Sequence, residues 1–209
     1  MTAVVAAGGN PPPPEAIAAA VEALRVGDIV GIPTDTVYGL AADPWHSGAA
    51  DRLFLVKWRP RNVELPLLVA GEEQALALAT AVPDSARRLM ARFWPGALTI
   101  VVPRGRDVDA DLGEEGGTIG LRCPNHPVPL ALCQALGPIA ATSANRHGSP
   151  PMTNAQDVAA GLPGVTLVLD AGLCDGASST VVDSTGEVPK LLRAGSIEWE
   201  QILAVVAGG

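Results

Sequence analysis

Pro138-Ile139-Ala140-Ala141-Thr142-Ser143-Ala144-Asn145 runs from an apolar segment straight into small polar side chains. A buried strand with this ending delivers hydroxyl and amide groups to a cleft at its carboxyl end. A second stretch, Lys57-Trp58-Arg59-Pro60, combines two cations with a proline. Because the residue before a proline is pushed out of the helical region, this string predicts a helix end, where cations are favoured and can turn towards an anion. Together the two stretches predict a phosphate or carboxylate ligand.

Outward from these stretches, predicted helices and strands alternate, with glycine and proline between them and no repeat period. We expect helices over residues 15–26, 49–56, 72–80, 83–93, 127–135, 154–160 and 197–206. We expect strands over residues 28–32, 66–70, 98–102, 118–122, 138–142, 165–170, 180–183 and 189–192. This alternation predicts the α/β class. Residues 1–14, which end in four prolines, are expected to be a flexible N-terminus, and residues 15–206 a single domain.

Composition and charge narrow the function classes. With 48% hydrophobic and 17% charged residues, the chain is predicted to be globular. Its formal net charge of −8 argues against a general nucleic-acid binder, which needs an excess of cations. The cations gather at Arg52, Lys57, Arg59 and Arg61. From charge alone, such a cluster is either an anion site or a solvated helix face.

Cysteine spacing and hydropathy bear on the compartment. Cys123, Cys133 and Cys174 lie far apart without a CxxC pair, so neither a disulfide framework nor a zinc site is indicated. We therefore expect a reduced, cytoplasmic protein. No apolar run approaches the ~18 residues of a membrane span, and the N-terminus lacks the basic segment of a signal peptide, so no membrane partner is expected.

Several ligand-binding motifs are absent from the sequence. Neither lysine follows a glycine-rich phosphate loop, and there is no GxGxxG after a predicted strand and no GxSxG. Asp107, Asp109 and Asp111 alternate as in a calcium loop, but Leu112 and Thr118 stand where glycine and glutamate are required. The three histidines share no ligand spacing. We expect a solvated acidic loop and no metal held by protein ligands alone.

A series of short motifs resembles the YrdC family over roughly residues 16–197. Each motif is weak alone, but their order and spacing together are specific. They are Pro33-Thr34-Asp35-Thr36-Val37-Tyr38-Gly39-Leu40, the KxRP string, Phe93-Trp94-Pro95-Gly96, Gly120-Leu121-Arg122, His126-Pro127, the SxN of Ser143 and Asn145, Ser179-Thr180-Val181-Val182-Asp183, and Leu191-Leu192-Arg193-Ala194-Gly195. The resemblance implies a YrdC-like twisted mixed β-sheet, flanked by helices around a concave basic cavity.

The resemblance also implies an activity. Members of the YrdC family make threonylcarbamoyl-AMP from L-threonine, bicarbonate and ATP, with release of pyrophosphate, for the t6A modification of tRNA. It implies Mg²⁺ held mainly by the phosphates, downstream proteins of the t6A transferase complex as partners, and only weak or indirect contact with tRNA. Two alternatives remain open: an O-carbamoyltransferase-like domain that handles carbamoyl-adenylate, and an RNA-binding module without catalysis.

Individual residues acquire roles from the resemblance. The implied catalytic residues are Lys57 and Arg59. The implied nucleotide contacts are Lys57, Arg59, Thr118, Ser143, Asn145 and Arg193. The implied threonine contacts are Thr34, Thr36, Arg122 and Ser179, and we add Ala141 and Ala70 as candidate apolar contacts for the threonine methyl group.

Structural roles remain open for several of these residues. Thr36 and Ser179 could be strand-edge or turn residues, and Thr34 and Asn145 could cap the backbone. Arg122 could pair with a structural carboxylate.

Three features depart from the family pattern. Trp58 is bulkier than the residue expected between the two cations, Ala70 stands near a position that often holds histidine, and the segment 61–65 is longer than usual. These departures concern the finer contacts of the threonine pocket.

Overall fold

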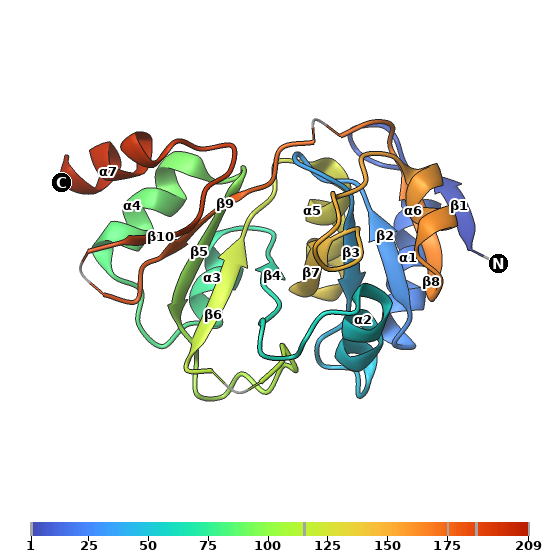
Figure 1. Cartoon of the computed structure of the whole chain (residues 1–209), viewed down its shortest axis with the longest axis horizontal. Helices are drawn as coiled ribbons and strands as arrows, with labels where there is room; N and C mark the ends of the chain where they lie inside the picture. Colours follow the sequence, from blue (N-terminus) through green and yellow to red (C-terminus); the bar gives the residue numbers. More distant parts are fainter. Residues whose placement is uncertain (1, 115, 175, 187, 209) are drawn as a thin grey trace.

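One mixed β-sheet of ten strands runs through the described part of the chain, with strand order β1-β8-β2-β3-β7-β4-β6-β5-β9-β10 (Figure 1). The computed structural model describes residues 2–114, 116–174, 176–186 and 188–208. The strands are β1 (Ala3–Ala6), β2 (Ile29–Ile32), β3 (Gly39–Ala42), β4 (Leu67–Leu68), β5 (Leu98–Pro103), β6 (Thr118–Arg122), β7 (Ile139–Ser143), β8 (Val165–Asp170), β9 (Thr180–Asp183) and β10 (Lys190–Arg193). The mixed sheet confirms the predicted fold class.

This sheet contains both parallel and antiparallel pairs. Strand β8 pairs parallel with β1 and β2, whereas β3 and β7 form antiparallel pairs in the middle of the sheet. The two-residue β4 joins the halves, because it pairs antiparallel with β7 and parallel with β6. Strand β5 then pairs antiparallel with β6 and parallel with β9.

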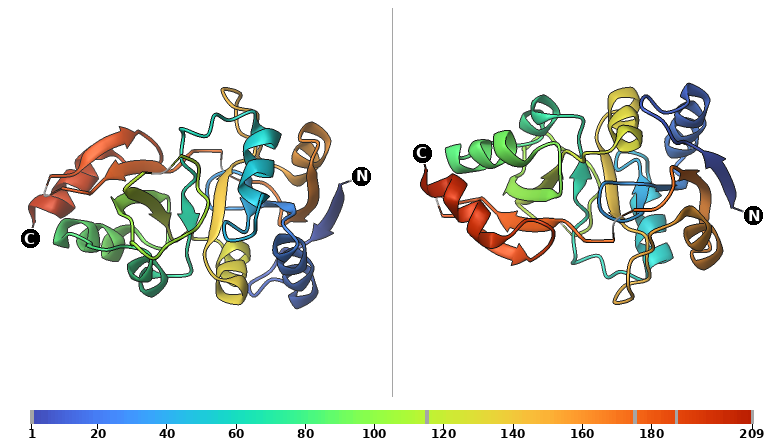
Figure 2. Two further views of the ribbon diagram at one scale, coloured as in Figure 1. Left: turned by 90° about the horizontal axis from the view of Figure 1, so that it is seen from below. Right: turned by 90° about the horizontal axis from the view of Figure 1, so that it is seen from above.

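Seven helices of the described chain pack around this sheet. They are α1 (Pro14–Arg25), α2 (Ala49–Lys57), α3 (Glu72–Ala77), α4 (Asp84–Phe93), α5 (Pro127–Leu136), α6 (Ala155–Gly161) and α7 (Trp199–Ala207). Helices α1 and α5 pack together on one face of the β1–β7 half, and α2 and α6 lie on the opposite face (Figure 2). Helices α4 and α7 pack against each other near the C-terminus, at the far end from β1.

The N-terminal segment differs from the expected flexible tail. Residues Ala3–Ala6 form β1, which pairs parallel with β8, and the N–H of Ala7 donates to the carbonyl of Asp170 (2.7 Å). The last proline of the run, Pro14, is the first residue of α1, where its missing N–H leaves no helical hydrogen bond unmade. The expectation of a flexible segment is therefore wrong for residues 3–7.

The other predicted elements are present, with ends shifted by a few residues. Strand β3 (Gly39–Ala42) is an addition, formed by the motif Gly-Leu-Ala-Ala between β2 and β7. None of the described helices is both long and apolar enough to cross a membrane.

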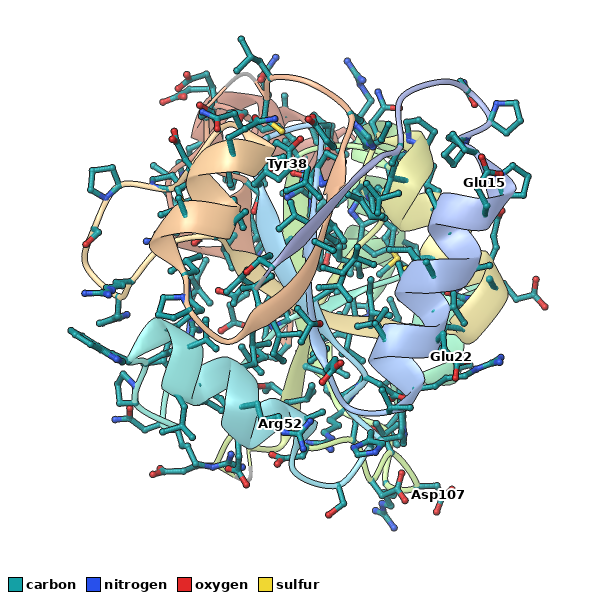
Figure 3. All side chains as sticks on the ribbon, turned by 90° about the vertical axis from the view of Figure 1, so that its right-hand side faces the viewer. Glu15, Glu22, Tyr38, Arg52 and Asp107 are labelled. Atoms are coloured by element: carbon teal, nitrogen blue, oxygen red, sulfur yellow. The ribbon has the colours of Figure 1, made fainter. Side chains whose placement is uncertain are left out.

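The acidic stretch after β5 is a surface loop, as expected. Asp107 and Asp109 are exposed, and Asp107 projects from the edge of the protein, whereas Tyr38 lies inside it (Figure 3). Asp111 instead pairs with Arg61 (2.5 Å). In the described part of the chain, no group of three or more His, Cys, Asp or Glu side chains could hold a metal ion.

Candidate active site

A cavity of about 250 Å³ opens over the neighbouring strands β7, β4, β6 and β5 of the sheet. Because side chains alternate between the two faces of a strand, alternate residues of β5 and β6 line its floor, whereas Ala141, Thr142 and Ser143 of β7 all line the cavity. The floor residues are Thr99, Val101, Gly120, Arg122, Ala141 and Ser143. The intervening side chains, such as Ile100 and Leu121, are fully buried on the other face. The apolar core on that side therefore fixes the polar floor on this one.

Arg122, at the end of β6, lies at one end of this cavity. Its side chain is only 7% exposed, and its Nη2 donates to Asp35 Oδ1 at 2.6 Å. Its Nε donates to the carbonyl of Gly96 (3.0 Å), and Nη1 donates to Thr36 Oγ1 (3.1 Å). Burial lowers the pKa of Arg122, and Asp35 opposes that shift. Arg122 thus does pair with a structural carboxylate. Three of the five guanidinium N–H groups are used, which leaves two for a ligand.

Thr34 and Thr36 form a directed pair of hydroxyl groups beside Arg122. Thr34 donates its only hydroxyl proton to the carbonyl of Val37 (2.7 Å), and its oxygen accepts the N–H of Thr36 (3.1 Å). Thr36 must therefore be the donor in the 2.9 Å contact between the two hydroxyls. Both lone pairs of Thr34 are then occupied, which fits the capping role left open above. Thr36 keeps one lone pair for a ligand.

Ser179 and Arg193 close the opposite wall. Ser179, directly before β9, is buried, and its hydroxyl lies 3.1 Å from that of Thr99. Arg193 of β10 reaches across to it, because Nη2 donates to both the carbonyl (2.8 Å) and the hydroxyl (2.9 Å) of Ser179. Four of the predicted site residues, Thr36, Arg122, Ser179 and Arg193, thus line one cavity.

Arg59 brings a third guanidinium group to the cavity. Its Nε donates to the carbonyl of Val63 (2.8 Å) and its Nη2 to the carbonyl of Glu64 (2.7 Å). Burial lowers the pKa of Arg59, and the nearby charge of Arg193 lowers it further. Arg193 has the same effect on Arg122. Three guanidinium groups that repel one another around one cavity indicate an anionic ligand.

Lys57 does not line the cavity, unlike Arg59. Its side chain is 2% exposed, and Nζ donates to the carbonyl of Ser143 (2.5 Å) and to the carbonyl and Oδ1 of Asn145 (2.9 and 3.0 Å). An ammonium group has three donors, so all of them are used. Lys57 therefore holds the turn after β7. Ser143 lines the cavity, and Asn145 is fixed within the turn, where its Oδ1 accepts the Ser143 hydroxyl (2.6 Å).

The charge of Lys57 predicts a pH dependence of stability. Burial, and secondly Arg59, lower the pKa of Lys57 from 10.5 to about 8. Between these values the unfolded chain binds a proton that the folded protein does not, so the free energy of unfolding should rise with pH through this window. Urea denaturation at pH 8 and pH 10 should show a smaller rise in Lys57→Met than in the wild type. Equal rises in both proteins would contradict the lowered pKa.

Two of the three departures from the family pattern, Trp58 and Ala70, lie outside the cavity. Trp58 ends α2 in the left-handed conformation (φ 53°), is 70% exposed and stacks on Arg146, whose Cζ lies 4.4 Å from the ring. It does not occupy the space between the two cations. Ala70 lines a different, mainly apolar pocket with Trp94 and Cys123, so the structure does not bring it to this cavity. Ala141 does line the cavity and is 6% exposed.

Thr118 lies at the other end of β6 from Arg122. At the strand rise of ~3.3 Å per residue, the two are separated by about 13 Å. Thr118 is not among the lining residues, although it shares a strand face with Gly120 and Arg122. It could contact only a ligand long enough to leave the Arg122 end.

Two acidic residues of this site were missed. Asp35 is the one charged residue in the first family motif, and that could have marked it as the partner of Arg122. Glu64 lies in the long 61–65 segment and lines the cavity, and burial raises the pKa of its carboxyl. No motif pointed to Glu64.

Comparison with known proteins agrees with this geometry. The model of the Sua5/YciO/YrdC family, described as "Telomere recombination", matches residues 22–195. The chain belongs to the Sua5/YciO/YrdC family. A relative from Mycobacterium tuberculosis H37Rv is 41% identical over 192 residues, which cover 91% of this chain and 88% of the relative. The threonylcarbamoyl-AMP synthase of Bacillus subtilis is 40% identical over 194 residues, which cover 91% of this chain and 56% of that protein.

Solved structures of this family have the same fold. Pyrococcus abyssi Sua5 complexed with L-threonine has a TM-score of 0.91 and 36% identity, covering 98% of this chain and 61% of that one. Escherichia coli YciO has a TM-score of 0.85 and 27% identity, covering 95% and 97%. The longer Sua5/YciO/YrdC members thus carry sequence that has no counterpart in these 209 residues.

Proposed function

We propose that this protein makes threonylcarbamoyl-AMP from L-threonine, bicarbonate and ATP, with release of pyrophosphate, for the t6A modification of tRNA. Relatives that bear the name threonylcarbamoyl-AMP synthase, in Bacillus subtilis and Pyrococcus abyssi, support the proposal. So does the related Sua5 structure from Pyrococcus abyssi, which is a complex with L-threonine. The single observation in the chain that carries it is the convergence of Arg59, Arg122 and Arg193 on one cavity.

The reaction divides the cavity into two ends. At one end the two unused N–H groups of Arg122 would bind the α-carboxylate of threonine, and the free lone pair of Thr36 would accept a hydrogen bond from the amino acid. The threonine amine and bicarbonate give a carbamate and water. A carbamate oxygen then attacks the α-phosphorus of ATP, and pyrophosphate leaves.

The chemistry explains why the reaction depends on cations and not on a general base. A carbamate is already anionic, so its attack on phosphorus requires no proton to be removed. What the step requires is alignment of the two substrates and stabilisation of charge on the phosphates. Arg59 and Arg193 would supply that charge, and the Ser143 hydroxyl, whose proton is donated to Asn145 Oδ1, could accept a hydrogen bond from the nucleotide.

Mg²⁺ fits this site only as a companion of ATP. Such an ion usually binds the phosphates of its substrate and one or two carboxylates, and keeps several waters. The described residues offer no cluster of three or more ligands, so the phosphates would hold the ion and it would neutralise their charge.

The experiment that tests the proposal is a measurement of pyrophosphate release from ATP. Release should require threonine and bicarbonate together, and omission of either should abolish it. Release that ignores threonine but responds to carbamoyl phosphate would instead favour the carbamoyltransferase alternative. The HypF structure in its phosphate- and nucleotide-bound form is 18% identical with a TM-score of 0.72, which shows a shared fold alone.

Transfer of the product to tRNA would fall to downstream proteins, so we predict that this protein alone binds tRNA weakly. The net charge is −8, and the three cavity arginines cannot neutralise many phosphates at once. Titration with tRNA near physiological salt should give a dissociation constant no lower than the ~10⁻⁴ to 10⁻⁶ M of non-specific binding. Tighter binding that survives added salt would revive the RNA-binding alternative.

Selection of threonine over serine should depend on Ala141. The two amino acids differ by one methyl group, which an apolar contact distinguishes by ~1–3 kcal/mol, so serine should be used about ten- to two-hundredfold less well. Ala141→Val would fill the space that receives the methyl group and should impair threonine more than serine. Pyrophosphate release with each amino acid measures both effects. An equal loss with both would place the contact elsewhere.

A further inference from the structure

One carboxylate in the cavity has no part in the proposed reaction. Glu64 is the one acidic side chain among the described lining residues. The other acidic residue of the site, Asp35, is already paired with Arg122. Among the described residues Glu64 forms no ion pair within 4.0 Å. A half-buried carboxylate beside a ligand cavity needs hydrogen-bond donors, and the ligand can supply them.

Main-chain contacts fix where Glu64 lies along the cavity. Its carbonyl accepts from Arg59 Nη2 (2.7 Å), so it is next to the proposed phosphate site. Its carboxylate accepts the N–H of Gly116, two residues before β6 begins, and the neighbouring Leu65 N–H donates to the Leu112 carbonyl (2.8 Å). Segment 61–65 therefore lies beside the β5–β6 connection, at the lower edge of the sheet (Figure 1). That is the Thr118 end of β6, far from Arg122.

The cavity changes character towards this end. Around Arg122 its floor and walls carry several hydroxyl groups. Towards Glu64 the lining includes Leu65, Pro66, Val101 and Gly120, with the Thr142 hydroxyl 3.5 Å from Arg59 Nη1. A Cβ atom on Gly120 would lie 3.3 Å from Pro66 Cβ, so a larger residue there would press on that wall. An apolar slot with one carboxylate, next to a phosphate site, suits a nucleoside.

Neither Arg104 nor Arg59 forms a described hydrogen bond with the carboxylate of Glu64, so it remains available to a ligand. Arg104 acts on it electrostatically, but Arg104 Nη2 donates to the carbonyls of Val108 and Ala110. Arg59 contacts only its main-chain carbonyl among the described bonds. A carboxylate can accept about four hydrogen bonds, so the Gly116 N–H leaves most of its capacity unused.

We propose that Glu64 accepts hydrogen bonds from the 2′- and 3′-hydroxyl groups of the ATP ribose and thereby selects ribonucleotides over deoxyribonucleotides. This inference rests on the proposed use of ATP. In ATP the ribose is bonded to the α-phosphate. In the proposed reaction the α-phosphate must lie near Arg59, which itself contacts the Glu64 carbonyl. The adenine amino group is at the far tip of the nucleotide and lies beyond this position. Carboxylates bind ribose hydroxyls in the same way in dinucleotide-binding folds.

The test compares ATP with 2′-deoxy-ATP and 3′-deoxy-ATP, by calorimetric binding and by threonine-dependent pyrophosphate release. The wild type should prefer ATP by about ten- to hundredfold, as expected for hydrogen bonds to a charged group. Glu64→Ala should reduce that preference to less than about threefold by weakening ATP alone, and Glu64→Gln, which keeps the shape, should be intermediate. Glu73→Gln removes the same charge from the exposed face of α3 and should behave as the wild type.

Each outcome bears on the inference separately from the proposed function. A wild type that binds the deoxynucleotides as well as ATP, or a Glu64→Ala variant that keeps the full preference, would overturn it. So would a Glu64→Ala variant that instead loses preference for ATP over inosine triphosphate, because Glu64 would then contact the base. If the wild type prefers ATP in binding but releases no threonine-dependent pyrophosphate, the ribose contact stands and the proposed reaction fails. Absence of any ATP binding would overturn both.

Discussion

Lys57→Met should lower the rate of pyrophosphate release by at least about a hundredfold and the free energy of unfolding by about 2–4 kcal/mol. Methionine keeps the length and the apolar stem of the side chain but removes all three donors. The carbonyls of Ser143 and Asn145 would then lose the partner that they have in this half-buried turn. Urea denaturation gives the stability, and pyrophosphate release gives the rate.

Arg59→Ala is the matched comparison, because it removes the neighbouring cation of the same motif. Arg59 lines the cavity, and the carbonyls that accept from its Nε and Nη2 lie in the partly exposed segment 63–64. We expect a comparable loss of rate with a loss of stability of only about 1 kcal/mol. If Lys57→Met proved as stable as Arg59→Ala, Lys57 would not be the anchor of the turn. If it kept its activity, the turn would not matter for the reaction.

The contrast between these two cations marks the limit of sequence reasoning at this site. The KxRP string correctly predicted the end of α2, which closes at Trp58. The string treats Lys57 and Arg59 alike, as two cations aimed at phosphates. The structure separates them, because Nζ of Lys57 meets main-chain oxygens 86 and 88 residues further along the chain. Such partners carry no side-chain signature, so no pattern in the sequence could name them.

Dependence on long-range partners also explains which strands could be predicted from the sequence. Strands β5, β8 and β9 are rich in β-branched residues and were predicted within a residue of their ends. Strand β3, Gly-Leu-Ala-Ala, has no such composition and is a strand because β2 and β7 pair with both of its edges. Long-range pairing overrides local propensity there, and the same holds for β1 against β8.

Arg122→Lys should raise the threonine concentration for half-maximal activity by about a hundredfold and change that for ATP by less than about threefold. The guanidinium group already bonds Asp35, Thr36 and the Gly96 carbonyl, and its planar fork still offers two N–H groups to a carboxylate. A lysine ammonium has three donors, and those protein acceptors would use all of them. Nothing would remain for the substrate.

Two titrations, one for each substrate, separate the roles that Arg122 could have. Arg87→Lys makes the same chemical change at a half-exposed arginine paired with Glu72 outside the cavity, and it should leave both titrations unchanged. If Arg122→Lys raised the half-maximal concentrations of threonine and ATP equally, Arg122 would be assigned to the nucleotide site instead. An unchanged threonine titration with a lower free energy of unfolding would reduce Arg122 to the structural partner of Asp35. Only a selective weakening of the threonine titration supports the proposed role, in which Asp35 holds the guanidinium group of Arg122 so that it can bind the carboxylate of threonine.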